Sequence, residues 1–428
     1  MPVKPSPVAF MESLFDCAVH AVHPDSCLAA HLPTDTVRGR TIILAAGKAA
    51  AAMATVTLAA LEAEKRADRL EGLVVTRGGH LAGQLPGTIE VIEAGHPVPD
   101  TMSRAAAPRM LALAESAREE DRIIALISGG ASALLAAPAD GISFSDKQQL
   151  TRHLLHSGAT ISEINCVRKH LSSIKGGRLA QAAAPAALFS FIISDVPGDD
   201  PADVASGPTV GDSSCLADAR DILQKYHWPA GGSVGAALEN PANESLFPGD
   251  SAFQRASTKI VARAADALAS AARLARKQGW QPVILGDALE GIAHTLGMEH
   301  GALACRYKQK GGRWAIISGG ETTVEVKNSA GRGGRNLEYL AGLAISLDGE
   351  PGISALACDT DGIDGTEAVA GATICDDFTV KCRQKGLDPA RFLADNDTYG
   401  LFERVGGLVT RGPTLTNVND FRVILVEG

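Results

Sequence analysis

Glycine, arginine and small polar residues concentrate in one stretch of this chain, residues 318–336. It opens with Ser-Gly-Gly-Glu-Thr-Thr and closes with Gly-Arg-Gly-Gly-Arg-Asn. The apolar run Trp314–Ile317 predicts a buried strand that gives way to a loop whose amides can approach a ligand closely. A second strand is predicted over 322–327, and Asn336 can cap a helix that begins near Leu337. Helix-start amides with two guanidinium groups suit a multiply charged oxyanion, so we interpret the stretch as a phosphate site. The alternative is a glycine-rich hairpin with two solvated arginines.

A lysine stands at another predicted strand end. Thr41–Ala46 reads as a buried strand, and Gly47-Lys48 follows it before an alanine-rich helix. Open α/β sheets bind ligands at the carboxyl ends of their strands, which makes Lys48 a candidate ligand group. The alternative is a surface lysine at a helix start. The motif is not a P-loop, because no glycine stands five residues before Gly47 and Ala49 replaces the Ser or Thr that binds magnesium.

Two further segments offer anion-binding features. The strand predicted over 122–127 ends in Ser128-Gly129-Gly130-Ala-Ser132, which echoes the Ser-Gly-Gly of residues 318–320 and predicts two similar strand ends across a cleft. Positive charge also gathers between residues 161 and 184, where a solvated helix face is the alternative interpretation. Within it, the two glycines of Lys175-Gly176-Gly177-Arg178 suit close backbone approach to an anion.

Acidic turns follow two predicted strands. Asp195 opens the first turn, together with Asp199 and Asp200, and a second turn carries Asp359, Asp361 and Asp364. Carboxylates at strand ends suit a magnesium ion or an acid/base role, although acidic turns are also common on surfaces. The second turn resembles part of a calcium loop, but no Glu stands at the last position of the twelve-residue pattern.

Composition limits the class of protein. The chain has 428 residues, of which 45% are apolar, and a net charge of -9 without a basic run, which argues against nucleic acid or an anionic membrane as the main partner. Its eight cysteines show no CxxC pair, so a zinc site or disulfide framework is not expected and a reducing compartment is favoured. Because the N-terminal segment lacks a continuous apolar core, we expect no signal peptide and a cytoplasmic protein.

Strands alternate with helices along the whole chain, which predicts an α/β fold. A loop-rich segment near residues 230–255 marks a boundary. We therefore predict an N-terminal domain over residues 1–240 and a C-terminal domain over residues 255–428.

Taken together, these segments resemble the class II glycerate kinases, also called glycerate 2-kinases, whose C-terminal half is the MOFRL domain. The resemblance spans nearly the whole chain and rests on AAGKAA, SGGASALL, INCVRKHLSSIKGGRLA, SDVPGDDPADVASGPT, SGGETTV, GRGGRN, CDTDGIDG and TNVND in that order. One departure is Leu337, where the family usually has Gln. The resemblance implies a two-lobed protein with a Rossmann-like N-terminal domain, a smaller α/β MOFRL domain and an active-site cleft between them.

The implied activity is transfer of the γ-phosphoryl of ATP to the 2-hydroxyl of D-glycerate, giving 2-phosphoglycerate, with Mg²⁺ or another divalent cation. Lys48 and Arg335 look like the family's essential cations, with Arg332 as second choice, and Asp195 is the candidate base or metal ligand. Asp359, Asp361 and Asp364 are the candidate metal or nucleotide ligands. The remaining candidates for binding substrate or nucleotide are Ser128, Gly129, Gly130, Ser132, Lys175, Gly176, Gly177, Arg178, Ser318, Gly319, Gly320, Glu321, Gly333, Gly334, Asn336, Asn417 and Asn419.

Two other functions compete with this one. An NAD(P)H-dependent hydroxypyruvate reductase needs a dinucleotide fingerprint, but no GxGxxG opens a helix here, and residues 331–336 place Asn where the third glycine would stand. A non-catalytic binder of small hydroxy acids would not need two carboxylate clusters beside the cations.

Overall fold

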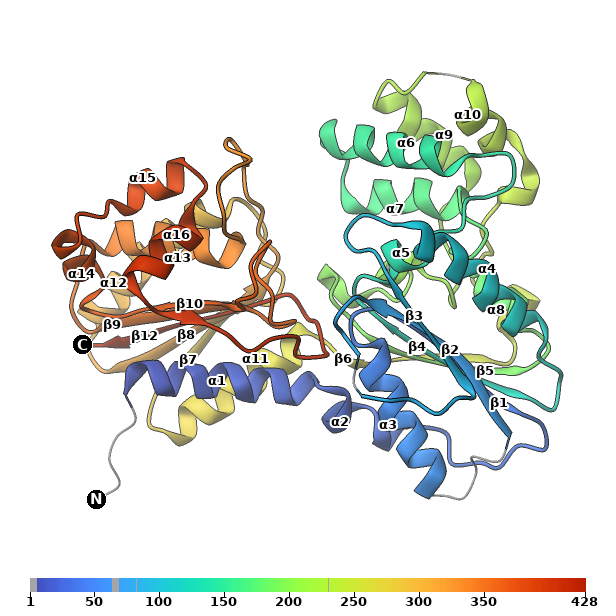
Figure 1. Cartoon of the computed structure of the whole chain (residues 1–428), viewed down its shortest axis with the longest axis horizontal. Coiled ribbons are helices and arrows are strands. Elements are labelled where there is room, and N and C mark those ends of the chain that lie inside the picture. The colour runs from blue at the N-terminus through green and yellow to red at the C-terminus, as the bar shows by residue number, and fades with distance from the viewer. Residues whose placement is uncertain (1–5, 64–68, 82, 230) are drawn as a thin grey trace. The chain divides into compact units, whose positions relative to one another are not determined.

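The computed structural model describes residues 6–63, 69–81, 83–229 and 231–428 (Figure 1). The chain divides into two compact units. Residues 27–261 form one, which we call the N-terminal unit. Residues 1–26 together with 262–428 form the other, the C-terminal unit.

A six-stranded sheet lies at the centre of the N-terminal unit, in the order β3-β2-β1-β4-β5-β6. The pairings β3–β2, β2–β1, β1–β4 and β4–β5 are all parallel. The two central strands are buried along their whole length, as their unbroken apolar sequences predict for strands covered on both faces. This strand order is that of the Rossmann fold, whose topological switch point lies between β1 and β4. The strands are β1 (Thr41–Ala46), β2 (Leu70–Arg77), β3 (Ile89–Ala94), β4 (Arg122–Ser128), β5 (Ala187–Ile193) and β6 (Ala256–Ala262).

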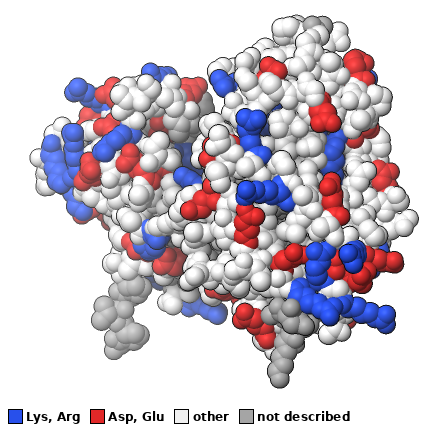
Figure 2. Space-filling model, turned by 45° about the vertical axis from the view of Figure 1, so that its right-hand side comes forward, with Lys and Arg blue, Asp and Glu red and all other residues white. Residues whose placement is uncertain are grey.

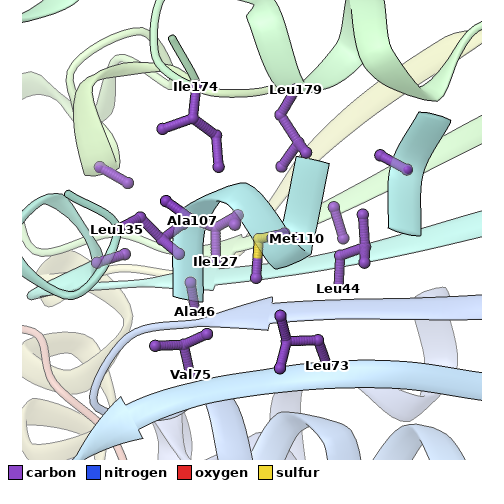
Figure 3. Packing of buried hydrophobic residues seen from close by; sticks show 14 of the residues in the cluster. Leu44, Ala46, Leu73, Val75, Ala107, Met110, Ile127, Leu135, Ile174 and Leu179 are labelled. Carbon is purple, nitrogen blue, oxygen red and sulfur yellow. The ribbon is translucent and has the colours of Figure 1, made fainter. Parts of the chain in front are cut away.

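Alternate residues of the strands face helices on opposite sides of the sheet. Leu44, Leu73 and Ile127 project into one core cluster, where they pack against Ala107 and Met110 of α4 (Figure 3). The helices that pack on this sheet are α3 (Ala50–Ala63), α4 (Thr101–Glu115), α5 (Ala131–Leu134) and α8 (Arg178–Ala183).

Four helices form a separate layer of the same unit (Figure 1). They share a core of their own, which includes Leu150, Leu154, Val167 and Leu223. Ser143 and Thr160 cap the first two of them through their side chains. These helices are α6 (Phe144–His156), α7 (Ile161–His170), α9 (Leu216–Lys225) and α10 (Gly232–Glu239).

The C-terminal unit holds a mixed sheet in the order β11-β10-β9-β12-β8-β7, in which only the pairing β7–β8 is parallel among the described residues. In Figure 1, α1 and α11 cover one face of this sheet, and α12 and α13 cover the other. The strands are β7 (Gln281–Gly286), β8 (Arg313–Gly320), β9 (Ile353–Asp359), β10 (Gly371–Ile374), β11 (Leu408–Val409) and β12 (Asp420–Glu427). The helices are α1 (Pro7–Val22), α11 (Ala264–Lys277), α12 (Ala293–Gln309), α13 (Arg335–Leu347), α14 (Phe378–Gln384), α15 (Pro389–Ala394) and α16 (Thr398–Val405).

The compact units divide the chain differently from the predicted domains, beginning with the first helix. α1 belongs to the C-terminal unit, where Phe10 stacks on Trp280 at 5.8 Å between ring centroids and Phe15 lies 6.0 Å from the ring of Phe421. The second boundary also moves, because β6 extends the sheet of the N-terminal unit and so places residues 256–261 there instead of in the C-terminal domain.

The predicted strand over 322–327 is absent, since within that segment only Thr323 forms a bridge, to Ile292. The strand predicted to end at Ile317 instead continues to Gly320 as β8. In the part of the chain that the structure describes, no helix is long and apolar enough to cross a membrane.

Candidate active site

Lys48 lies at the topological switch point of the N-terminal sheet. Its amide donates to Gly129 O at 2.9 Å, and the amide of Ala49 donates to Ser128 Oγ at 3.0 Å. Gly47 has φ +129°, and a Cβ atom there would overlap the Ser128 hydroxyl, so only glycine allows the loops after β1 and β4 to come this close. The sequence prediction that Lys48 stands at a strand end is therefore confirmed.

The glycine after β4 lies close to two basic side chains. Gly130 has φ +84°, and a Cβ atom there would lie 3.4 Å from Lys48 Cγ and 3.0 Å from His96 Cδ2. Asp195 follows β5 at the same edge of the sheet, because Ile193 pairs with Ser128. The carboxyl ends of the strands of this sheet thus supply all of these groups: Lys48, His96, Ser128–Ser132 and Asp195.

A cavity of about 500 Å³ opens beside this edge, between the loop at His96, α5 and the helices α6 and α7. Among the described residues, its lining includes no Asp or Glu. Five basic side chains line it: His96, Lys147, Arg152, Arg168 and Lys175. We call this the basic cavity. On the face of the molecule in Figure 2, lysine and arginine are interspersed with acidic side chains, so the acid-free lining is a local feature. Such a lining suits an anionic ligand.

Among these cations, Lys175 is held by several hydrogen bonds. Its Nζ donates to Ser132 O at 3.2 Å and to Ala205 O at 3.3 Å, and Ser132 Oγ lies 2.8 Å from Ser206 Oγ. Ala205 and Ser206 are buried and have φ values of 56° and 60°, which cost roughly 1–2 kcal/mol each for residues other than glycine. Such strain persists only where the surroundings hold the backbone in place, and here it sets the acceptors around Lys175.

The charges in the basic cavity are poorly compensated by the protein. Burial, and then the charge of Arg168, lowers the pKa of Lys175 to about 7. Burial also lowers the pKa of Lys147 well below its usual value, with Lys175, Arg168 and Arg178 adding to the effect. An anion in the cavity would offset the desolvation and the repulsion between these cations.

Residues 176–178, predicted to approach an anion, are bonded within the chain. The amides of Gly176 and Gly177 donate to Ser206 O and Gly207 O, and the Arg178 guanidinium donates to four backbone carbonyls, those of Lys169, Lys175, Asn243 and Glu244. The two glycine amides thus hold the turn at residues 206–207, and Arg178 holds the loop that precedes β6. Only Lys175 of the motif lines the cavity.

In the C-terminal unit, Arg335 is held by carboxylates. Its guanidinium donates to Asp420 at 2.7 Å, to Asp359 at 2.7 Å and to Glu321 at 2.9 Å. Burial lowers the pKa of Arg335, but the charges of Asp420, Asp359 and Glu321 prevail and raise it well above its usual value. An anion at this position would compete with three carboxylates of the protein itself.

The backbone amides at the start of α13 also have an acceptor within the chain. Asp364 is fully buried and accepts from the amides of Asn336 at 3.0 Å and Leu337 at 3.1 Å. Burial raises the pKa of Asp364 to about 6, opposed by these amides and assisted by Asp420. A phosphate bound at this helix start would have to displace a carboxylate of the chain, so the phosphate site there stays a prediction.

The other predicted ligands of the C-terminal unit contact residues of the same unit. Ser318, Gly319 and Gly320 belong to β8 and pair with Arg422, Phe421 and Asp420 of β12, so they form no loop cradle. Gly333 and Gly334 lie against Thr398 and Asp364, and Arg332 pairs with Glu403 at 3.1 Å and stacks over Tyr399. Asn417 and Asn419 are buried in the turn before β12, and Asn419 O accepts from the amide of Thr360.

The predicted metal ligands do not converge. Asp359 accepts from Arg335 and from the amide of Asp361, Asp361 accepts from the amide of Ile363, and Asp364 caps α13. Across the described ranges, no three His, Cys, Asp or Glu side chains are grouped to hold a metal ion. These residues do not fit a metal centre as arranged, and no chemical step is derived through one.

Sequence reasoning missed most of the cavity wall. Lys147, Gln148, Thr151, Arg152 and Leu155 recur with helical spacing on one face of α6 and all line the cavity. In the sequence, the helical spacing of these basic and polar residues could have indicated that one face of α6 lines a site. Arg168 was noted only as part of a positively charged segment.

Comparison with known proteins agrees with this architecture. Residues 10–239 match the family model described as "Domain of unknown function (DUF4147)", and residues 314–420 match the "MOFRL family". The chain is 46% identical over 421 residues to a protein of Agrobacterium vitis named "Putative hydroxypyruvate reductase", covering 97% of this chain and 94% of that protein. It is 36% identical over 413 residues to the D-glycerate 2-kinase of Thermotoga maritima, covering 96% of each.

Among solved structures, the crystal structure of a glycerate kinase from Thermotoga maritima aligns over 98% of both chains, with 35% identity and a TM-score of 0.85. Both parts of the fold are thus shared with this structure. The chain belongs to the class II glycerate kinase family, with a DUF4147 domain followed by a MOFRL domain.

Proposed function

We propose that this protein transfers the γ-phosphoryl group of ATP to the 2-hydroxyl of D-glycerate, giving 2-phosphoglycerate and ADP. The relatives named glycerate 2-kinase support this reaction class. The observation that carries it is the basic cavity. Five cationic or titratable basic side chains, and no carboxylate of the described residues, surround a space beside the switch point. Both substrates are anions and suit that space.

Phosphoryl transfer depends mainly on alignment and on neutralising charge, because the reaction requires little covalent chemistry from the protein. We assign Lys48 to the transferring phosphoryl group or to the glycerate carboxylate, with the cavity cations as its neighbours. The amides of residues 129–130 are the proposed backbone donors. A role for Arg335 in the same reaction stays a prediction.

A divalent cation is proposed to enter as the complex with ATP. Magnesium keeps several waters and is commonly bound through substrate phosphates and one or two carboxylates. Asp195, at the sheet edge that carries Lys48, is the proposed carboxylate of this kind.

The test is product identification by phosphorus NMR after incubation with ATP, magnesium and D-glycerate. We expect the resonance of 2-phosphoglycerate and an equal amount of ADP, and no product when glycerate is omitted. Formation of 3-phosphoglycerate would correct the acceptor position. Tight glycerate binding without ADP release would instead support a non-catalytic binder.

The name of the Agrobacterium vitis relative favours a second candidate, hydroxypyruvate reduction with NADH or NADPH. Two features at the switch point oppose it. The turn after β1 reads Gly47-Lys48-Ala49-Ala50 instead of GxGxxG, and β2 ends in Arg77, where an acidic residue would bind the ribose of NAD. Oxidation of NADH or NADPH by hydroxypyruvate at enzyme-like rates would overturn the kinase assignment.

A further inference from the structure

A buried lysine in the wall of the basic cavity lacks a carboxylate partner among the described residues. Lys175 is 3% exposed, and the hydrogen-bond partners of its Nζ are neutral oxygens: Ser132 O, Ser132 Oγ and Ala205 O, at 3.2 to 3.3 Å. Lys169, six residues earlier, is buried to a similar degree but forms an ion pair with Asp212 at 3.1 Å. The chain therefore pairs one buried lysine and leaves the other with neutral partners.

The groups that face Lys175 disfavour its charged form. Lys147 on α6, Arg168 on α7 and Arg178 at the start of α8 are all cations, and His96 and Arg152 line the same cavity. Among the described residues, a chain of hydrogen bonds leads from Ser132 to Ser206, then to Asn165, and then to the carboxylate of Asp203. Because a buried amine among cations releases its proton readily, the pKa of Lys175 near 7 has a structural cause.

The geometry also suits a neutral amine. A neutral amine has two N–H bonds, which the carbonyls of Ser132 and Ala205 accept, and a lone pair for a third partner. The left-handed turn at residues 205–206 fixes one of these carbonyls, and Ser132 belongs to the cavity wall itself. The side chain is thereby held in place without a carboxylate that would keep it protonated.

We propose that Lys175 is the proton acceptor for the hydroxyl group that receives the phosphoryl group, an inference that rests on the proposed kinase function. As the hydroxyl O–H bond breaks, its proton binds the lone pair of Nζ. The oxygen forms a bond to the γ-phosphorus of ATP, while the bond from that phosphorus to the bridging oxygen breaks and leaves its electron pair on ADP. The resulting ammonium group then faces the more negative product.

The experiment is the pH dependence of kcat for the wild-type protein and for Lys175→Arg, which keeps a charge but cannot accept a proton near neutral pH. A general base must be deprotonated, so wild-type kcat should fall as pH drops below about 7. We expect Lys175→Arg to lose at least roughly a hundredfold in kcat, with KM changed only a few fold, and to lose this acid limb. The matched control is Lys169→Arg, a buried lysine outside the cavity wall, which should keep the limb.

A second variant distinguishes a loss of turnover caused by the missing amine from one caused by misfolding. Lys175→Ala removes the amine and leaves space for a small one, so added methylamine should restore part of the turnover, more strongly at higher pH. Wild-type protein that makes no 2-phosphoglycerate would refute the proposed function itself. If the wild type is active and Lys175→Arg keeps both its turnover and its acid limb, only the role of Lys175 is refuted. The same holds if the acid limb disappears in Asp195→Asn and not in Lys175→Arg.

Discussion

Lys48 illustrates what a single position in a sequence can reveal. A lysine directly after a buried strand and a glycine is placed by the sheet itself, because the carboxyl ends of parallel strands meet at one edge. The partners of Arg335, in the other unit, were harder to foresee. The carboxylates that hold Arg335 come from Asp359 and Asp420, up to 85 residues away, and their approach depends on the pairing of β9 with β12. No local pattern contains that information.

Replacing Lys48 by alanine should lower kcat for glycerate phosphorylation at least roughly a hundredfold. The reason is loss of one charged contact to the transferring group or the carboxylate, which commonly costs about 3–4 kcal/mol of barrier. Steady-state assays of ADP release measure this. Lys381→Ala, which removes an exposed lysine on α14, is the control and should leave turnover unchanged. Near-normal turnover of the Lys48 variant would remove this residue from the mechanism.

Arg168 should set the pH at which the enzyme loses activity. Its charge contributes to the lowered pKa of Lys175, so Arg168→Gln should raise that pKa and move the acid limb of kcat to higher pH. The same variant should weaken glycerate binding, because one cavity cation is lost. A pH profile of kcat together with KM measures both effects, and an unmoved limb would contradict the coupling.

At the scale of elements, Asp364 shows how a motif that favours anion binding can be satisfied within the chain. The glycine-arginine stretch does lead into a helix, as predicted, but Asp364 accepts from its first amides. The predicted strand at 322–327 failed for a related reason. Both edges of β8 are already taken by β7 and β12, so the following segment has no strand to pair with there.

Asp364→Ala should lower the free energy of unfolding by about 1–2 kcal/mol, since two buried amides lose their acceptor. Urea denaturation measures the change. The matched control is Asp388→Ala, which removes the cap of the exposed helix α15 and should cost less. Equal losses in the two variants would contradict a special contribution of the buried cap.

Asp364 should also make stability depend on pH. Its pKa in the folded protein, about 6, lies above the ordinary value of 3.8, so the stability linked to its protonated form is present below the unfolded pKa. It is lost as pH rises through about 6, by up to about 3 kcal/mol. Asp364→Asn should flatten this dependence in urea titrations at several pH values, and an unchanged slope would refute it.

At the scale of the whole molecule, the division into units was only partly readable. The loop-rich segment near residue 240 predicted that the chain has two parts, and a boundary near there holds to within about twenty residues. The sequence does not predict to which unit α1 belongs, because the apolar face of this helix predicts that it is buried but not the surface against which it packs. That surface is made by α11, β9 and β12, more than two hundred residues later.

Phe15→Ala should therefore destabilise the C-terminal unit and not the N-terminal one. Removing a fully buried phenylalanine commonly costs about 3–5 kcal/mol. Hydrogen exchange followed by mass spectrometry should show faster exchange in β9 and β12 and unchanged exchange in β1 and β4. Phe247→Ala, at an exposed position of the N-terminal unit, is the control. Faster exchange in both sheets would contradict the assignment of α1.

The placement of α1 has a consequence for biosynthesis. This helix leaves the ribosome before the other unit, so residues 27–261 must be translated before its main packing partners exist. At about 5–20 residues per second, Phe10, Leu14 and Phe15 wait on the order of tens of seconds with their apolar face uncovered. During that interval the nascent chain presents a short amphipathic helix suited to a chaperone, while the unit behind it can already fold.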